Sequence, residues 1–351
     1  MNIILIILVF GIIVFFHELG HFIVAKLNKI SVTEFSIGMG PAIVSFKRKE
    51  TKYSLRILPL GGYCMMVGEE EAVDDVNSFS NKSVWARMAV IVAGPVFNFI
   101  LAFVFSIIMI HFTGCDPARL SKIEPGSAAE DAGLSAGDTI KEINGDKIYT
   151  FREISLHMTI NDPTEPVELL VKRENGNLEN IVVTPKMDEE AGRYIMGIYG
   201  EEVLPNGIGM NIKYAALEIR YWMKATLTSL KMIFTGNVSK DDVMGPIGVG
   251  GAMNEVIETV KEYSATQKEV IINIILNMLN WSILLSVNLG IMNLIPIPAL
   301  DGGKLFLLII EAIRRKKLPQ EKEAVIQFIG LVFVIGLMIF VMFNDIKNVF
   351  F

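Results

Sequence analysis

The sequence predicts a polytopic α-helical membrane protein with about four transmembrane helices, a membrane-associated β-hairpin region and an inserted polar domain. Of its 351 residues 52% are hydrophobic and 20% are charged, and the mean hydropathy of +0.46 is high for a soluble domain of this length. Long uncharged stretches lie toward both ends, whereas residues 113–202 carry many acids and bases. These observations together indicate membrane spans interrupted by an aqueous module.

Four stretches are apolar enough to cross a bilayer, which takes about 20 mainly apolar residues. They are residues 3–27, 88–112, 271–292 and 324–343. No Lys or Arg precedes the first stretch, so we interpret it as a retained span and not as a cleavable signal peptide. The third stretch has asparagines close to helical spacing, so we expect one of its faces to contact protein instead of lipid.

The Lys and Arg residues of the short loops predict the orientation. They cluster after the first span and before the fourth, which places both loops in the cytoplasm. An even number of spans then puts both termini and the 113–205 module outside the cytoplasm, in a multi-pass protein of the cell membrane. Cys64 and Cys115 fall on opposite sides and cannot pair. The net charge of −6, without a long basic run, argues against a nucleic-acid partner.

The chain divides into four parts in this interpretation. Residues 1–112 form the first half of a membrane core, residues 113–205 the polar module, residues 206–270 an amphipathic linker, and residues 271–351 the second half of the core. Within the linker, a helix over 215–234 is expected to lie against the membrane or to lead into the third span.

Residues 32–63 predict one or two β-hairpins beside the charged end of the first span. Strand-like stretches alternate there with charged turn residues, and Gly38 and Gly40 mark a turn. Strands can enter the membrane only where protein shields their backbone, because unpaired backbone groups are costly in lipid. An exposed edge could pair with an extended substrate, or the hairpins could serve packing alone.

The first span contains His17-Glu18-Leu19-Gly20-His21, an H-E-x-x-H sequence. On a helix the two imidazoles at i and i+4 share one face and can hold one metal ion, usually zinc, and Glu18 can act as general base on a water at that ion. Two histidines and a carboxylate inside a membrane span are expensive without a metal or polar partners, which makes the pattern more specific than it is in a soluble protein.

Asp301 is the best candidate for a third metal ligand. It lies in the sequence Asn293 to Gly303, where two prolines break the third span and place irregular backbone at membrane depth. Catalytic zinc takes three protein ligands and leaves one position open. The alternative is an ordinary helix terminus with Asp301 as its N-cap. His111 and His157 compete poorly, since they lie at or beyond the outer end of the second span.

These two elements resemble the two-part signature of the site-2 protease family of intramembrane metalloproteases. Further matches lie at residues 38–41, 94–98 and 244–248, and residues 119–186, with small residues and glycines around Asn144-Gly145, resemble a PDZ domain of membrane and periplasmic proteases. The resemblance implies that His17, His21 and Asp301 bind Zn²⁺ and that Glu18 is the general base. It places Asn293 near the scissile carbonyl, although a helix-capping role stays open. Gly94 and Asn98 would support packing near the site.

The resemblance further implies regulated intramembrane proteolysis. The substrates would be single-span membrane proteins, such as anti-sigma factors or signal-peptide remnants, cut in or beside their transmembrane segments in the lipid bilayer. The PDZ-like domain would bind a peptide ligand or exclude uncut proteins by size. Two competing functions stay open, a non-proteolytic metal-binding membrane scaffold and a transporter with a metal site at the midplane. Transporters often carry internal repeats, and this sequence shows none.

Overall fold

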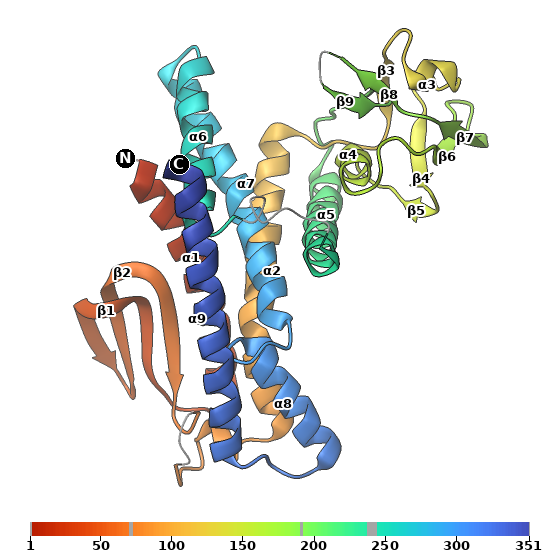
Figure 1. Cartoon of the computed structure of the whole chain (residues 1–351). Coiled ribbons are helices and arrows are strands. Elements are labelled where there is room, and N and C mark those ends of the chain that lie inside the picture. The colour runs from red at the N-terminus through yellow and green to blue at the C-terminus, as the bar shows by residue number, and fades with distance from the viewer. Residues whose placement is uncertain (1, 70–72, 190–191, 237–243, 351) are drawn as a thin grey trace. The chain divides into compact units, whose positions relative to one another are not determined.

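The computed structural model describes all residues except 1, 70–72, 190–191, 237–243 and 351 (Figure 1). The chain forms two compact units, which are described separately below. One unit contains Met1–Ser106 and Ser229–Phe351, and the other contains Ile107–Thr228. Residues 237–243 of the expected amphipathic linker lie outside the described residues.

The first unit is mainly helical. Its helices are α1 (Asn2–Leu27), most of α2 (Val84–Thr113), α6 (Pro246–Tyr263), α7 (Gln267–Leu294), α8 (Asp301–Arg314) and α9 (Gln320–Phe350), with a short 3₁₀ turn at Phe79–Asn81. Among the described residues, four helical segments are long and apolar enough to cross a membrane. These are Asn2–Leu27, Val84–Thr113, Gln267–Leu294 and Glu321–Lys347. Each of the four stretches expected to span the membrane therefore lies within one of these helical segments.

Helices α1 and α2 approach each other closely at a glycine. A Cβ atom at Gly20 would lie 2.3 Å from the carbonyl oxygen of Ala93, so only glycine fits there without a shift. Pro95, inside α2, has no N–H to donate to the preceding turn. The contact at Gly20 places the histidine-bearing third of α1 against α2. An apolar cluster joins α1 to α6 and α7 through buried residues that include Ile13, Met253 and Met278.

Strands β1 (Val32–Arg48) and β2 (Thr51–Met66) form a strongly bent hairpin, which agrees with the hairpins expected from the sequence. Residues 32–37 pair with 62–66 and also with 52–55, while residues 42–48 pair with 51–56. Gly38 and Gly40 have φ angles of 85° and 83° and lie where β1 changes direction, a conformation that favours glycine. The segment 62–66 thus lies at one edge of the sheet.

The last helix is tied to α6 by one carboxylate. Asp345 of α9 is 3% exposed and accepts hydrogen bonds from the backbone N–H groups of Gly245 and Gly248, each at 2.8 Å. These N–H groups lie at the N-terminus of α6, where a negative charge is favourable. A Cβ at Gly245 would lie 2.7 Å from Asp345 Oδ2. The glycines of the 244–248 motif therefore make room for a carboxylate about a hundred residues away.

The second unit contains the predicted polar module. Its helices are α3 (Ala128–Asp131), α4 (Phe151–Ile160) and most of α5 (Ile208–Thr235). Its strands are β3 (Leu120–Ile123), β4 (Thr139–Ile143), β5 (Asp146–Lys147), β6 (Val167–Lys172), β7 (Leu178–Val183), β8 (Lys186–Asp188), β9 (Arg193–Ile195) and β10 (Ile198–Gly200). The sheets have the orders β5-β4-β6-β7, β10-β3 and β8-β9. Alternating apolar residues of β6 form the core with Ile140 and Ile143 of β4 and with buried residues of α3 and α4.

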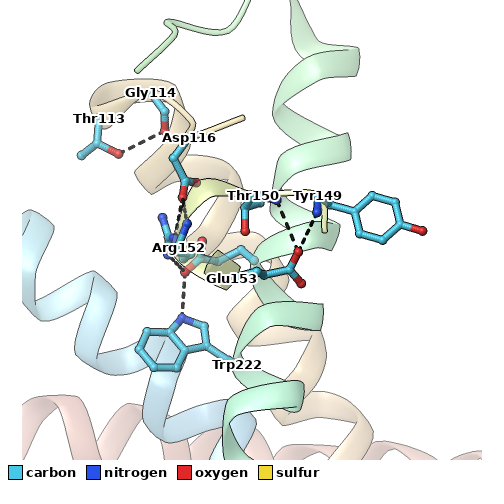
Figure 2. Close-up of polar contacts among 9 residues, drawn as sticks. Thr113, Gly114, Asp116, Tyr149, Thr150, Arg152, Glu153 and Trp222 are labelled. Atoms are coloured by element: carbon cyan, nitrogen blue, oxygen red, sulfur yellow. Dashed lines mark hydrogen bonds and ion pairs between the residues drawn. The ribbon is translucent and has the colours of Figure 1, made fainter. Parts of the chain in front are cut away.

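A charge network joins α4 to α5 within this unit (Figure 2). The Arg152 guanidinium donates to Asp116 Oδ2 at 3.1 Å and to Glu218 at 2.8 Å, and Trp222 Nε1 donates to Glu218 at 2.7 Å. Burial raises the pKa of Glu218 above its usual range, and Arg152 acts in the opposite direction. Glu153 binds Arg220 of α5 in the same region. Helix α5 therefore packs on the module through paired charges.

We expect Arg152→Met to loosen the contact between α4 and α5, because it leaves the 4%-exposed Glu218 without its cation. The cost should be about 2 kcal/mol, below that of a fully buried pair, since a third of the Arg152 side chain is exposed. Hydrogen exchange over residues 151–160 of the full chain should rise roughly thirtyfold. Arg119→Met, at an exposed pair of the same unit, is the control. Equal exchange in the two variants would contradict the prediction.

Candidate metal centre

Three lone-pair atoms converge where α1 meets the start of α8. His17 Nε2 lies 3.1 Å from Asp301 Oδ2, His21 Nε2 lies 3.4 Å from the same oxygen, and the two Nε2 atoms are 3.2 Å apart. Among the described residues this is the one group of three or more His, Cys, Asp or Glu side chains with metal-binding spacing, and its ligand atoms lie within 4.8 Å of one another. The structure thus brings together the three ligands expected from the sequence.

The hydrogen bond at His21 Nδ1 determines which of the two ring nitrogens carries the proton. His21 Nδ1 lies 2.9 Å from the carbonyl oxygen of Val90, in α2. A carbonyl oxygen only accepts hydrogen bonds, so Nδ1 carries the proton and Nε2 keeps its lone pair. A backbone acceptor of this kind orients metal-binding histidines in proteins generally. The exposed fraction of the His21 residue is 7%, so this nitrogen is shielded from bulk water.

Asn98 holds the other histidine in the same way. Its side-chain amide nitrogen lies 3.2 Å from His17 Nδ1, and its Oδ1 is buried without a hydrogen-bond partner. With the amide turned so that Oδ1 faces the ring, Oδ1 accepts from Nδ1–H and both groups are satisfied. His17 Nε2 then keeps its lone pair. Asn98 therefore has a more specific position than the packing role expected from the sequence.

Asp301 reaches the histidines from the first turn of α8. Leu300 is the N-cap residue and makes no side-chain cap, so the carboxylate of Asp301 is not used as the helix cap that the alternative assumed. Asp301 Oδ2 is buried with no hydrogen-bond donor. A Cβ at Gly302 would lie 2.1 Å from the carbonyl oxygen of Ile295. The double glycine after Asp301 thus lets the turn fold tightly under the carboxylate.

The turn between α7 and α8 is also held by the last helix. The backbone N–H of Ala299 donates to Gln327 Oε1 of α9 at 2.5 Å, and Ala299 has a φ angle of 77°. A Cβ at Gly330 of α9 would lie 2.3 Å from Pro298. The irregular backbone before Asp301 is therefore packed against α9 at Pro298 and Ala299.

Gly94 leaves space for both histidines. A Cβ at this position of α2 would lie 2.3 Å from His21 Nε2 and 2.8 Å from His17 Cε1. The two imidazole rings therefore occupy the space that a side chain at position 94 would take. Gly94 thus allows both rings to lie against α2, where a side chain would displace their nitrogens.

A pocket of about 500 Å³ opens onto these ligand atoms. Glu18 lines it together with His17, His21 and Asp301, and the opposite wall includes Tyr63, Cys64, Met65 and Met66 of the β2 edge segment. The backbone of β2 runs close to the acid, since a Cβ at Gly62 would lie 3.2 Å from Glu18 Cγ. Asn293, at the end of α7, places its amide nitrogen 3.4 Å from His17 Nε2. Glu18 therefore lines the pocket itself, whereas Asn293 lies beside His17 and is not among the lining residues.

Sequence reasoning missed an ion pair at this pocket. Glu69 lines the pocket, and its Oε1 accepts from Lys304 Nζ at 2.6 Å. Lys304 lies one helical turn after Asp301, whereas Glu69 follows β2. The pair thus ties the end of the edge segment to the helix that begins with Asp301. The 235-residue separation left no local signal, although an uncommon lysine so close to Asp301 in an apolar region pointed to a partner.

Comparison with known proteins identifies the family of the chain. The profile of peptidase family M50 matches residues 5–337. A putative zinc metalloprotease of Clostridium acetobutylicum is 37% identical over 345 residues, covering 98% of this chain and 97% of the relative. The regulator of sigma-W protease RasP of Bacillus subtilis is 32% identical over 428 residues, covering 98% of both proteins. A putative zinc metalloprotease of Campylobacter jejuni is 34% identical, covering 98% of this chain and 92% of the relative.

The fold and the converging ligands define a metalloprotease with membrane-spanning helices. The chain belongs to peptidase family M50, the site-2 proteases, and is a zinc-dependent metalloendopeptidase. A PDZ domain of an SdrC-like protein from Listeria innocua also matches, with 21% identity, a TM-score of 0.22, and coverage of 25% of this chain and 97% of that one. Such a low score leaves the fold of the polar module to be argued on other grounds.

We expect Gly94→Ala to lower the affinity for zinc at least roughly tenfold. The added methyl group would displace the rings of His17 and His21 from the orientation that their hydrogen-bond partners give them. Zinc per protein, measured by atomic emission after dialysis against graded chelator, tests this. Gly336→Ala is the matched control, since a Cβ there meets nothing within 4 Å. Equal zinc retention in both variants would show that the space beside the ligands is not required.

We also expect Lys304→Met to open the pocket, because Glu69 loses the cation that ties the β2 edge to α8. A partly buried pair of this kind contributes about 1–2 kcal/mol, which corresponds to roughly tenfold faster labelling of Cys64 by a small thiosulfonate reagent. The experiment uses a Cys115→Ser background. Lys26→Met, which breaks the Lys26–Glu50 pair of the same unit, is the control. The reversed pair E69K/K304E should restore slow labelling.

Proposed function

We propose that His17, His21 and Asp301 bind the catalytic zinc and that Glu18 is the general base for peptide hydrolysis. The observation that carries the proposal is the convergence of three buried lone-pair atoms beside an acid in a pocket bordered by a free sheet edge. Three atoms that each present a lone pair, such as these two nitrogens and the carboxylate oxygen, repel one another at such short distances unless a cation lies between them. The buried Asp301 Oδ2, which has no hydrogen-bond donor, fits such a cation.

A zinc ion held by His17, His21 and Asp301 would supply Lewis-acid chemistry to water and to the scissile carbonyl. The carboxylate of Glu18 accepts the proton of the attacking water and passes it to the nitrogen of the leaving segment. The amide of Asn293 donates to the carbonyl oxygen as negative charge develops on it. Val90 and Asn98 keep the two imidazoles in the tautomers that leave both Nε2 atoms free.

The substrate proposed here is a single-span membrane protein bound in an extended form. A transmembrane helix has satisfied its own backbone hydrogen bonds, so a turn must unwind before water can attack. The segment 62–66 pairs with 32–37 on one side, and its other side has no strand partner among the described residues. The unwound chain can add there as a further strand. Anti-sigma factors and signal-peptide remnants are the proposed physiological substrates. The name of the Bacillus relative, regulator of sigma-W protease, favours the first of these.

We place the hairpin partly in the membrane. Several large apolar side chains of β1 and β2 are exposed, among them Met39, Ile43, Val44, Phe46 and Leu55. Exposed apolar residues of this number on a small sheet favour contact with lipid or with an apolar substrate. The orientation deduced from the loop charges puts the zinc site toward the cytoplasm, with both termini and the polar module on the other side.

We propose that the 113–205 module is a PDZ-like domain that binds an extended peptide. A cavity of about 570 Å³ lies between α4 and the strand β10, and Phe151, Ile154, Met158 and Ile198 line it. Strand β10 pairs with β3 alone among the described strands, which leaves an edge for strand addition beside an apolar helix face. Exclusion of substrates with large ectodomains is the second role for the same module.

Glu18→Gln tests the proposed mechanism directly. We expect this variant to keep its zinc and to lose cleavage of a model single-span substrate in liposomes by at least roughly a hundredfold, since the amide cannot accept a proton. Glu50→Gln, at an exposed acid of the hairpin, is the control and should cleave like the parent. Cleavage by Glu18→Gln at the parent rate would overturn the mechanism.

Asp301→Ala separates the protease from the metal-binding scaffold. We expect it to lose zinc as well as activity, because two histidines alone hold zinc weakly. A structural site in a scaffold takes four protein ligands, and the cluster among the described residues offers three. A parent protein that holds zinc but cuts no substrate, with full retention in Asp301→Ala, would favour the scaffold.

A further inference from the structure

A second polar cavity of the first unit lies away from the metal ligands, between the start of α2 and the end of α8. Its volume is about 540 Å³. The lining consists of Lys82, Ser83, Val84, Trp85, Arg87, Glu311, Ala312, Arg315, Lys316 and Lys317. Five of these side chains are basic and one is acidic, so the cavity attracts anions. Neither the proposed zinc site nor the proposed substrate edge uses these residues.

The base of the cavity contains a cation whose hydrogen bonding is incomplete. Arg87 is 6% exposed, and its two terminal nitrogens donate to the Glu311 carboxylate. Its Nε is buried without a hydrogen-bond partner among the residues that the structure describes. An unpaired donor on a buried guanidinium costs free energy unless an acceptor reaches it. An anion in the cavity would supply that acceptor.

The start of α2 adds favourable electrostatics. Ser83 Oγ accepts from the N–H of Ala86, and the first N–H groups of a helix this long have no partner inside the helix. A helix N-terminus binds phosphate groups through these donors and through its dipole. Lys82 precedes the helix, while Arg315 and Lys316 approach from α8. Donors from two helices thus surround the space in which an anionic group would lie.

The position of the cavity along the chain indicates a ligand from the bilayer. It lies where the candidate span Val84–Thr113 begins, and the basic residues from α8 directly precede the candidate span Glu321–Lys347. Trp85 is 71% exposed in the first turn of α2, and tryptophan is enriched at the membrane–water interface. Basic pockets between spans at this level bind anionic lipid headgroups.

We propose that this cavity binds the phosphate headgroup of an anionic phospholipid. Lys82, Arg315 and Lys316 would surround the phosphate, and Arg87 Nε would donate a hydrogen bond to it from the base of the cavity. The lipid would link the ends of two helices that both reach the metal centre. Gly94 lies two turns after Arg87 in α2, and Asp301 begins the helix that Arg87 contacts through Glu311. Lipid binding would therefore stabilise the packing of α2 on α8, independently of the protease assignment.

Purified full-length protein in neutral detergent tests the proposal. Short-chain phosphatidylglycerol, phosphatidylcholine of the same chain length, and inorganic phosphate are each titrated, with bound ligand read by native mass spectrometry and stability by thermal unfolding. We expect phosphatidylglycerol to bind and to raise the Tm, and the other two ligands to do neither at equal concentration. Equal effects of inorganic phosphate would show a site for free anions, and equal effects of phosphatidylcholine would show unspecific lipid uptake. Either result overturns the proposal.

The variant K82Q/R315N/K316Q should bind phosphatidylglycerol at least roughly tenfold more weakly, since each basic residue at a lipid surface contributes about fivefold. The matched control is K47Q/R48Q/K49N, which removes three exposed basic residues of the hairpin. Lys49 and Arg315 both have positive φ angles, 54° and 51°, so each variant places one asparagine in a left-handed position. Equal weakening in both variants, or none in the first, overturns the proposal. The single variant K316E repeats the test should the triple variant fail to fold.

Discussion

The close approach of α1 and α2 is the constraint on which the rest of the structure depends. Two glycines make it possible, Gly20 against the backbone of Ala93 and Gly94 against the rings of His17 and His21. Because the helices touch at backbone distance, the carbonyl of Val90 and the amide of Asn98 reach the ring nitrogens that face away from Asp301. The polar groups of the first span are therefore satisfied by its neighbour, and their remaining lone pairs point to one place.

Much of this organisation could be predicted from the sequence because the bilayer imposes a simple rule. Hydropathy locates the four spans, and charged residues inside a span mark a site because they are expensive there. The same reasoning finds Asp301, since two prolines break the helix just before it. Residue type and spacing are enough to predict a site where a polar residue without partners costs several kcal/mol, as it does inside a membrane span.

The contacts between distant segments could not be predicted. The pairs Glu69–Lys304, Arg87–Glu311 and Asp345–Gly245 join residues far apart in the chain, and the sequence around one member does not identify the other. Helix α6 is similar, because its apolar residues are too few for a span although Met253 and Ile257 are fully buried. Such elements become visible only when the partner helices are in place.

The contact of α9 with the turn before Asp301 has a consequence for substitutions far from the metal centre. Gln327 and Gly330 hold this turn from a helix that carries none of the candidate site residues, so the position of the Asp301 carboxylate depends on how α9 packs. A shift in the tilt or register of α9 would move this carboxylate relative to the two histidines without altering any of the three side chains.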